Sequence, residues 1–352
     1  MKLTILNDWH IGCVRSAGTT PATAYQLRLD LLTQFGDTLE GIDTDLMVLG
    51  DLFDGPDISK ADLLSTYHLL WNWLETRPTC SLTLVPGNHD LAKNSTNLSS
   101  FQLLAELVKS SFEDRVTYIT EGTLTPHGYV IPHVANQDLF NLELAKVPKC
   151  RFLFVHCNWD NGFAVESDHS LNLSKQQAID LPVDHIVFAH VHQATLAMNG
   201  KILVIGNQFP SSVSDCLGNA EKCLMVIDSE DFATGRVTWK AKDDFLEADW
   251  RDLSGLVDAT QRFIRITGTA TAAEAGAVPT AIARFRRDAT ALVITNAVKI
   301  EGVDDAAQMA LSHEEVTSFN VRAALREYLG EADWARIEEL EKAEEPEEKI
   351  AA

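Results

Sequence analysis

Aspartate, asparagine and histidine side chains recur in five short motifs within the first 192 residues of the chain. In chain order the motifs are Asp8-Trp9-His10, Gly50-Asp51-Leu52-Phe53-Asp54, Gly87-Asn88-His89-Asp90, Val155-His156-Cys157-Asn158 and Ala189-His190-Val191-His192. Their carboxylate, amide and imidazole groups are typical ligands of divalent cations. Two cations about 3.5–4 Å apart can hold a phosphate and stabilise both the attacking and the leaving oxygen. The residue types therefore predict a two-metal site that hydrolyses phosphoesters.

A compact run of apolar residues precedes each motif. The runs are Leu3–Leu6, Leu46–Leu49, Leu82–Val85, Phe152–Val155 and Ile186–Phe188. Such runs predict strands buried on both faces, and in layered α/β folds the functional groups gather at the strand ends. We therefore expect the five motifs to converge on one place. Apolar residues at helical spacing in residues 25–39 and 63–74 predict two helices that cover a sheet.

The spacing of these residues indicates how each could reach a cation. Two close cations repel each other, so a carboxylate must lie between them. Asp51 is the expected bridge, because Gly50 lets the backbone turn sharply into the site. Side chains two positions apart in an extended strand share a face. The outer residues of Asp8-Trp9-His10 are therefore expected to point the same way, as are those of His190-Val191-His192.

The ordered set D-x-H, G-D-x-x-D, G-N-H-D, H and H-x-H resembles the calcineurin-like metallophosphoesterases. Their usual G-H-x-H stands here as Ala189-His190-Val191-His192, with the glycine replaced. Asp8-Trp9-His10-Ile11-Gly12 resembles more narrowly the first motif of the SbcD-like (Mre-type) DNA repair and recombination nucleases, and the second and third motifs look like that branch too. The short chain and compact tail look most like a bacteriophage version of the nuclease subunit. The resemblance covers residues 1 to about 230.

The resemblance implies a role for each matching residue. One cation would be bound by Asp8, His10, Asp51 and His192, and the other by Asp51, Asn88, His156 and His190. His89 would lie over the phosphate and protonate or polarise the leaving oxygen, with Asp54 orienting its ring. A hydroxide would be the nucleophile, since bound cations lower the pKa of water.

The function implied by the resemblance is Mn²⁺-dependent hydrolysis of DNA phosphodiesters, as a 3′→5′ exonuclease on duplex ends and an endonuclease on single strands. The mixture of imidazole and oxygen ligands suits Mn²⁺ or Fe²⁺ better than Mg²⁺, although Mg²⁺ stays open. Asp54 also leaves open a metallophosphatase or cyclic-nucleotide phosphodiesterase, because archaeal and eukaryotic relatives of the nuclease often carry histidine there. A non-catalytic scaffold is the third alternative, although no ligand position is lost.

Composition indicates a soluble protein with more than one core. The chain has 352 residues, of which 45% are hydrophobic and 23% are charged, so we expect a large catalytic domain with a smaller appendage. No apolar run approaches the roughly 18–20 residues that span a bilayer, and the first residues predict a strand, not a signal peptide. The six cysteines are scattered, which favours reduced thiols in the cytoplasm, that of the bacterial host if the chain is phage-encoded.

The net charge of −22 is unfavourable for a protein that binds DNA alone. Part of it lies in an acidic tail over residues 338–348. The remainder indicates that DNA affinity comes largely from a partner, but it would fit a small-molecule phosphatase equally well.

Three domains are expected along the chain. Residues 1–240 would form the nuclease domain, which the resemblance implies is a two-sheet α/β sandwich flanked by helices. Residues 241–303 would form a small α/β capping domain: a linker or wrapping arm over 243–258, a strand over 263–267, a helix over 271–287 and strands over 291–295 and 298–300. Residues 304–352 would form two helices and the acidic tail, the first helix beginning at the capping box Ser312-His313-Glu314-Glu315.

In the SbcD-like family the C-terminal region binds the coiled coil of an SMC-type ATPase, SbcC, so we expect such a partner here. Docking of these helices on their own domain is the alternative, and a homodimer stays open.

Five residues are candidate DNA contacts. Arg15 lies in the loop after the first motif, and His133 follows a predicted strand over 129–131. The others form a basic cluster in the expected cap: Arg284, Arg286 and Arg287. Arginines in loops and at helix ends are also common as solvated surface residues, and that alternative stays open. Trp9 is expected to pack beside the metals rather than stack on a base.

Overall fold

Two six-stranded sheets form the centre of the computed structural model, which describes residues 2–13, 21–92, 97–161, 170–209, 222–228, 234–239 and 245–302. The first sheet has the order β14-β13-β1-β2-β3-β4, with β1 to β4 mutually parallel and β13 and β14 added antiparallel at one edge. Its strands are β1 (Lys2–Leu6), β2 (Asp45–Leu49), β3 (Leu82–Val85), β4 (Val116–Tyr118), β13 (Lys222–Asp228) and β14 (Thr234–Trp239).

The second sheet has the order β11-β12-β10-β7-β6-β5, with a parallel centre and an antiparallel strand at each edge. Its strands are β5 (Thr123–Thr125), β6 (Gly128–Ile131), β7 (Cys150–His156), β10 (Val183–Ala189), β11 (Thr195–Ala197) and β12 (Ile202–Val204). A short parallel pair, β8 (Asn158–Trp159) and β9 (Asn172–Leu173), follows β7 in the chain. Each of the five predicted strands is therefore present.

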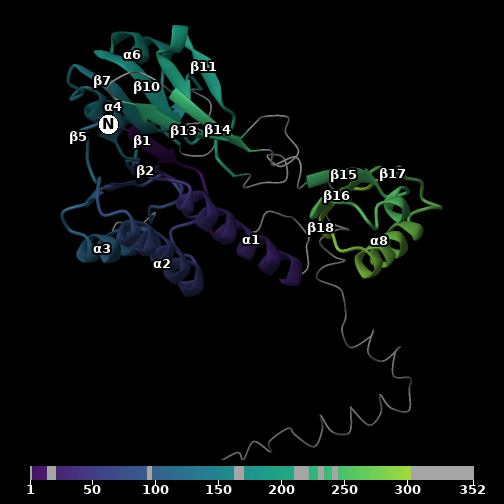
Figure 1. Cartoon of the computed structure of the whole chain (residues 1–352). Coiled ribbons are helices and arrows are strands. Elements are labelled where there is room, and N and C mark those ends of the chain that lie inside the picture. Colours follow the sequence, from purple (N-terminus) through teal and green to yellow (C-terminus); the bar gives the residue numbers. More distant parts are fainter. Residues whose placement is uncertain are drawn as a thin grey trace, which may run out of the picture.

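Helices cover the outer faces of both sheets (Figure 1). On the first sheet these are α1 (Pro21–Glu40), α2 (Lys60–Thr76) and α3 (Ser100–Ser111), and on the second α4 (Gln137–Leu144) and α6 (Lys175–Asp180). Between the sheets lies a separate apolar layer to which both contribute, including Ile5, Met47, Phe154 and Val187, all fully buried. Strands buried on both faces, with helices outside, confirm the predicted sandwich.

Helix α1 shows why the sequence pattern was informative. Leu27, Leu31, Phe35 and Leu39 recur every four residues, and all are at most 3% exposed. At 3.6 residues per turn this spacing places them along one stripe, of which Leu31, Phe35 and Leu39 face the sheet. Helices α2, α3 and α6 begin at serine caps, where the side chain accepts a backbone N–H of the first turn and stabilises the helix start.

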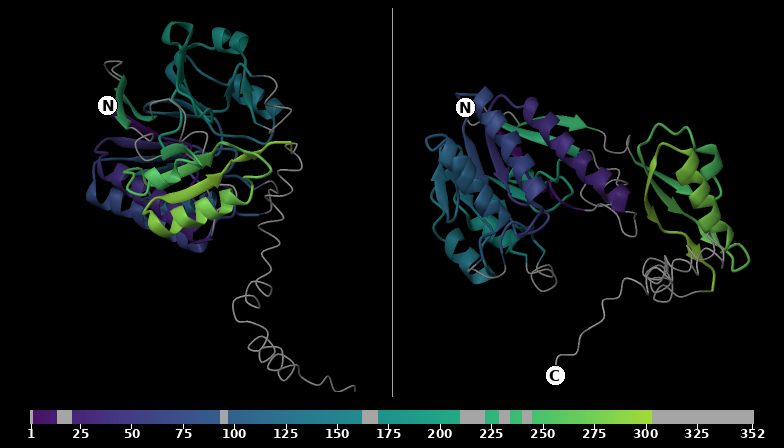
Figure 2. Two further views of the ribbon diagram at one scale, coloured as in Figure 1. Left: turned by 90° about the vertical axis from the view of Figure 1, so that its right-hand side faces the viewer. Right: turned by 90° about the horizontal axis from the view of Figure 1, so that it is seen from below.

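Residues 245–302 form a smaller unit with its own apolar core. Strands β15 (Phe245–Asp249), β16 (Phe263–Thr267) and β18 (Leu292–Asn296) make a parallel sheet. Helix α8 (Ala277–Asp288) buries Val278, Ile282 and Phe285 in that core. A second parallel pair, β17 (Thr269–Ala270) and β19 (Lys299–Ile300), completes the unit (Figure 2).

Two details of this unit differ from prediction. The segment over 243–258 is not a linker: it contains β15, and Phe245 and Ala248 are buried. The helix begins six residues later than predicted, at Ala277, because the residues before it form a turn in which the Glu274 carboxylate accepts hydrogen bonds from Thr271. The predicted boundaries at 240 and 303 stay predictions, since 240–244 and 303–352, including the expected C-terminal helices, lie outside the described residues.

The smaller unit contacts the first half of α1. Leu27 packs against Phe245 and Phe263, and Arg262 makes an ion pair with Asp30. Because β1 and β2 are parallel, the helix between them starts at the sheet edge where β1 ends. The unit therefore lies toward that edge, as Figures 1 and 2 show.

Among the helices of the described residues, none combines the length and the apolar composition needed to cross a membrane.

Candidate metal centre

The motif residues that follow the strands have an unusual backbone. The φ angle is +51° at Asp8, +48° at His10, +50° at Asp51 and +85° at His190. Non-glycine residues rarely adopt this left-handed conformation, and when they do they cluster at functional sites. The prediction that each pair of ligands lies in an extended strand was wrong, because β1 ends at Leu6 and β10 ends before His190.

Backbone hydrogen bonds between the first two motifs hold these turns in register. The Asp8 N–H donates to the Gly50 carbonyl at 3.0 Å, and the His10 N–H donates to the Asp51 carbonyl at 3.0 Å. Gly50 has a φ of +84°, so the predicted sharp turn at this glycine is present. A pair of neighbouring parallel strands thus carries Asp8, His10 and Asp51 into one place.

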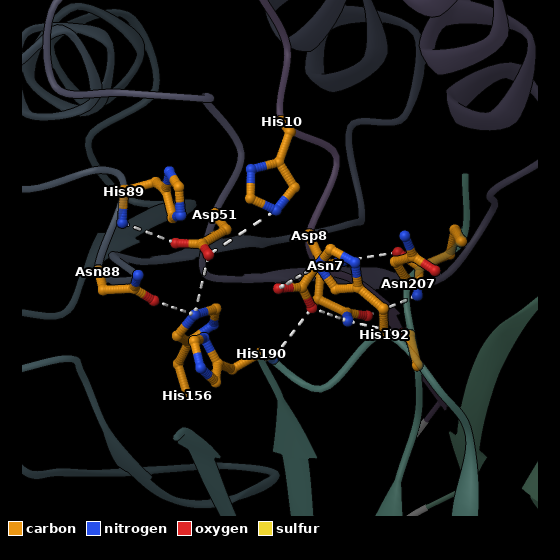
Figure 3. A network of polar contacts seen from close by, with 12 residues as sticks. Asn7, Asp8, His10, Asp51, Asn88, His89, His156, His190, His192 and Asn207 are labelled. Carbon is orange, nitrogen blue, oxygen red and sulfur yellow. Dashed lines mark hydrogen bonds and ion pairs between the residues drawn. The ribbon is translucent and has the colours of Figure 1, made fainter. Parts of the chain in front are cut away.

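Ligand atoms from all five motifs meet in this place (Figure 3). Three triplets have donor atoms within 4.8 Å of one another. We call Asp8, His10 and His192 the first triplet, and Asp51, His156 and His190 the second triplet; the remaining one is His10, Asp54 and His89. The first triplet contains three of the four ligands expected for one cation, all but Asp51, and the second contains three of the four expected for the other, all but Asn88.

The Asp51 carboxylate lies between the two sets. Its Oδ2 is 3.2 Å from His156 Nε2 and 3.9 Å from His10 Nε2. Its Oδ1 accepts the backbone N–H of His89 at 2.9 Å, which holds the carboxylate in position. Asp51 is 1% exposed, so both oxygens are committed to the site. This placement is the one that a bridging carboxylate requires.

The surroundings of His156 fit a cation. Its Nδ1 is 3.0 Å from the Leu49 carbonyl, so Nδ1 carries a proton and Nε2 is the ring nitrogen that faces the site. That Nε2 faces two oxygens, Asn88 Oδ1 at 3.1 Å and Asp51 Oδ2 at 3.2 Å. These three atoms need a positive charge between them, which a proton on Nε2 supplies in the metal-free protein and a bound cation would supply in its place.

The first triplet also fits a cation, because it contains buried polar atoms without hydrogen-bond partners. Asp8 Oδ2 accepts hydrogen bonds from the His190 N–H at 3.0 Å and from the Asn7 side-chain amide. Asp8 Oδ1, by contrast, is buried without a hydrogen-bond partner among the described residues, as are both ring nitrogens of His10. His192 Nε2 lies 4.0 Å from the Asp8 Oδ1 atom. Buried polar atoms without a hydrogen-bond partner are costly unless a ligand satisfies them. The residues of this triplet therefore fit a bound cation.

The carboxylates control the charge of these imidazoles. Burial lowers the pKa of an imidazole, but Asp54, Asp51 and Asp8 outweigh it at His10 and raise its pKa to about 9. Burial is likewise outweighed by Asp51 at His156, whose pKa is also about 9. Burial alone would raise the pKa of Asp51, but His156 and His10 hold it well below its usual range. The site therefore attracts positive charge strongly.

His89 is held differently from what the sequence predicted. Its Nδ1 lies 2.8 Å from the backbone carbonyl of Asp54, not from the Asp54 carboxylate. The carboxylate Oδ1 lies 3.4 Å from Nδ1 of His10, whose ring meets the His89 ring edge-on at 4.8 Å between centroids. The carbonyl and the carboxylate of Asp54 thus contact different histidines. With Nδ1 engaged, Nε2 of His89 is the atom available to a substrate.

Asp90 is a site residue to which the sequence assigned no role, although it closes the third motif. It is fully buried, and its carboxylate accepts the N–H groups of Gly87 at 2.9 Å and Phe53 at 3.0 Å. These bonds tie the second and third motif loops together. Burial, and then the charge of Asp51, raise the pKa of Asp90 to about 7.

The predicted DNA contacts have different locations. His133 lies beside the centre, where burial and then His156 lower its pKa to about 4; its backbone N–H donates to the Pro86 carbonyl. Arg284 and Arg287 both pair with Asp288 at the exposed end of α8. Of the other two predicted contacts, Arg286 is exposed, and Arg15 lies outside the described residues.

Trp9 is a packing residue, as expected. It is fully buried, with its ring edge-on to Phe35 at 5.0 Å and stacked on Phe209 at 5.9 Å between centroids. A nucleic acid base cannot reach it.

The comparison with protein families agrees with this geometry. The family model of the calcineurin-like phosphoesterases matches residues 1–194, which is more than half of the chain. The chain therefore belongs to this family. Members of the family typically bind two divalent metals, and the triplets above are the candidate metal-binding groups of this chain. No curated protein sequence matches the chain.

The solved structures that match the chain are distant from it. One is described as a novel archaeal phosphodiesterase, with 12% identity and a TM-score of 0.34 over 68% of this chain and 100% of its own. Another is the purple acid phosphatase PPD1 from yellow lupin (Lupinus luteus) seeds, also with 12% identity and a TM-score of 0.34, over 67% of this chain. The match spans about half of the lupin chain, 52%.

Proposed function

We propose that this protein is a two-metal DNA nuclease of the SbcD type, which hydrolyses phosphodiester bonds in DNA repair or recombination in the cytoplasm. The observation that carries the proposal is the Asp51 carboxylate, placed between His10 and His156 with a donor triplet on either side. Membership of the phosphoesterase family supports the reaction class. The D-W-H-I-G form of the first motif supports DNA as the substrate.

The residues divide the work of hydrolysis between them. The mixture of imidazole and oxygen ligands favours Mn²⁺ at the two triplets. Divalent cations bound there would neutralise the phosphate and make a water nucleophilic near neutral pH. Asp51 holds both positions together. His89 presents Nε2 at the half-buried rim of the site and, as the imidazolium, supplies the Nε2 proton to the leaving oxygen, while the Asp54 carbonyl keeps its ring in one orientation.

The smaller unit supports a DNA substrate by its location. It contacts the half of α1 that begins at the same sheet edge as the metal centre. A unit at this edge can restrict access to the site and guide a long substrate, which a small-molecule phosphatase does not need. We therefore propose a capping role for residues 245–302 (Figure 2).

Degradation of DNA by the purified protein tests the proposal. With Mn²⁺, an end-labelled duplex should be shortened from its 3′ end, and a single-stranded or hairpin substrate should be cut internally. Asp51→Asn, which removes the bridging charge, should abolish both activities. Simple phosphate mono- and diesters are assayed beside the DNA. Turnover of these esters with DNA untouched, alone and with the ATPase partner added, would overturn the nuclease proposal.

That outcome would support the second candidate, a metallophosphatase or cyclic-nucleotide phosphodiesterase. The observations that favour it are the aspartate at position 54 and the net charge of −22, which disfavours unaided DNA binding.

We also propose that an SbcC-like ATPase binds the C-terminal segment beyond residue 302. This partner would supply the DNA affinity that the acidic chain lacks. Truncation before Ser312 should leave hydrolysis of a small diester within about twofold of the full chain, because the metal centre lies far earlier in the sequence. The same truncation should abolish co-purification of the ATPase. Retention of the ATPase by the truncated chain would contradict this assignment.

A further inference from the structure

A cluster of polar side chains lies fully buried behind one side of the metal centre. Its members are Asn7, Asn207, Gln208 and Lys222, and none is more than 3% exposed. Asn7 directly precedes the first motif, Asn207 and Gln208 follow β12, and Lys222 begins β13. The sequence shows no motif here, because Asn7 lies about two hundred residues before the other three members.

One half of the cluster holds Asp8. The Asn7 side-chain amide donates to Asp8 Oδ2 and to the Gly206 carbonyl, the latter at 2.7 Å. Gln208 holds Asn7 in turn: its Oε1 accepts the Asn7 backbone N–H at 2.6 Å, and its amide donates to Asn7 Oδ1 at 2.5 Å. The Asp8 carboxylate is thereby oriented with Oδ1 toward His192.

The other half holds His192. The Lys222 ammonium donates to the His192 carbonyl at 3.3 Å and to the side-chain oxygen of Asn207. The backbone N–H of Asn207 donates to the same His192 carbonyl at 3.4 Å. Figure 3 shows Asn207 on the side of Asp8 and His192 that lies away from Asp51.

This cluster joins the two sheets at the metal centre. Asn7 directly follows β1 and Lys222 begins β13 of the first sheet, whereas Asn207 and His192 follow β12 and β10 of the second. Burying an ammonium group is expensive unless hydrogen bonds satisfy it, and apolar packing would hold the sheets together at lower cost. The hydrogen bond from the Lys222 ammonium group to the carbonyl of the candidate ligand His192 gives the charged group a role at this position.

We infer that Lys222 and Asn207 are positioning residues that set the affinity of one of the two cation positions, the first triplet, and leave the other unchanged. Both site residues reached by the hydrogen bonds above, Asp8 and His192, belong to that triplet. The second triplet is held instead by the Leu49 carbonyl and Asn88 at His156. The inference presupposes the two cation positions of the proposed function, but not the DNA substrate.

Titration of the protein with Mn²⁺, followed by the electron paramagnetic resonance signal of the free ion, tests this inference without an activity assay. The wild-type chain should bind two ions. Lys222→Met should weaken one of them by about 10–100-fold, the usual effect of removing a group that orients a metal ligand, and leave the other within about twofold. Lys201→Met is the matched control, because the Lys201 ammonium likewise donates to two oxygens, the backbone carbonyls of Ile179 and Leu181, away from the centre.

A second pair of variants separates positioning from general damage and covers the case in which Lys222→Met does not fold. Asn207→Ala removes the acceptor of the ammonium group and should weaken the same single ion. Asn207→Asp keeps an oxygen acceptor and should retain both ions. Equal weakening of both ions, or of neither, in folded Lys222→Met and Asn207→Ala would overturn the inference. A wild-type chain that binds two ions but does not cut DNA would overturn the proposed substrate alone.

Discussion

Replacing His89 with alanine should lower the turnover of a phosphodiester by about 10²–10⁴-fold while both cations stay bound. The ring Nδ1 of His89 is engaged by the Asp54 carbonyl at 2.8 Å, and its backbone N–H, which the substitution keeps, is the group that holds Asp51. The variant therefore removes the proton donor without disturbing the bridge. Steady-state rates are measured beside Mn²⁺ binding for the same preparations.

Because the ligand atoms of His89, His10 and Asp54 also form a triplet, the result decides between two roles. Loss of one bound cation in His89→Ala would show that His89 is a ligand, not the acid. The exposed His68 of α2 provides a matched control, and His68→Ala should leave both rate and binding unchanged. Asp54→Asn should keep most of the activity, because the carbonyl that orients His89 is retained.

Much of the catalytic domain could be predicted because its signals are local. An apolar run such as Leu82–Val85 can be satisfied only between two covered faces, and the structure buries all four of its residues. Parallel strands then bring their ends to one edge, so that motifs distant in the chain meet. Order and residue type were therefore sufficient to assemble the two triplets.

The features that escaped prediction depend on tertiary contacts. A left-handed backbone at Asp8 or His10 is stabilised by hydrogen bonds to the neighbouring strand's loop, which no spacing rule contains. The same holds for Asp54, whose carbonyl and carboxylate serve different histidines. In the sequence, Lys222 resembles any lysine at the start of a strand. Only the fold shows that its ammonium group contacts the His192 carbonyl.

The second large effect should come from a glycine that carries no chemistry. Gly50→Ala should remove at least one of the two bound cations and lower phosphodiester turnover by about 10³-fold or more, as expected when a preorganised site is misplaced. A Cβ at this position would lie 2.2 Å from Nδ1 and 2.7 Å from Cγ of His156. The φ of +84° adds strain of roughly 1–2 kcal/mol for any residue other than glycine.

The imidazole of His156 has no room to retreat. It is 1% exposed, its Nδ1 is bound to the Leu49 carbonyl, and its Nε2 faces Asp51 and Asn88. Any shift that relieves the clash breaks the contact that fixes its tautomer or withdraws Nε2 from the second triplet. The measurement is Mn²⁺ stoichiometry and thermal unfolding of the variant beside wild type.

Gly55→Ala is the control for this experiment, because Gly55 lies five residues further along the same motif loop and a Cβ there would meet nothing within 4 Å. It should retain two ions and wild-type turnover. Gly87→Ala should fail as Gly50→Ala does, but from the opposite side, since its Cβ would lie 2.2 Å from Asp51 Oδ1. Two ions bound at wild-type affinity in folded Gly50→Ala would mean that His156 is not a ligand. The two glycines are thus as necessary to the site as its ligands, because they provide the space in which Asp51 and His156 approach each other.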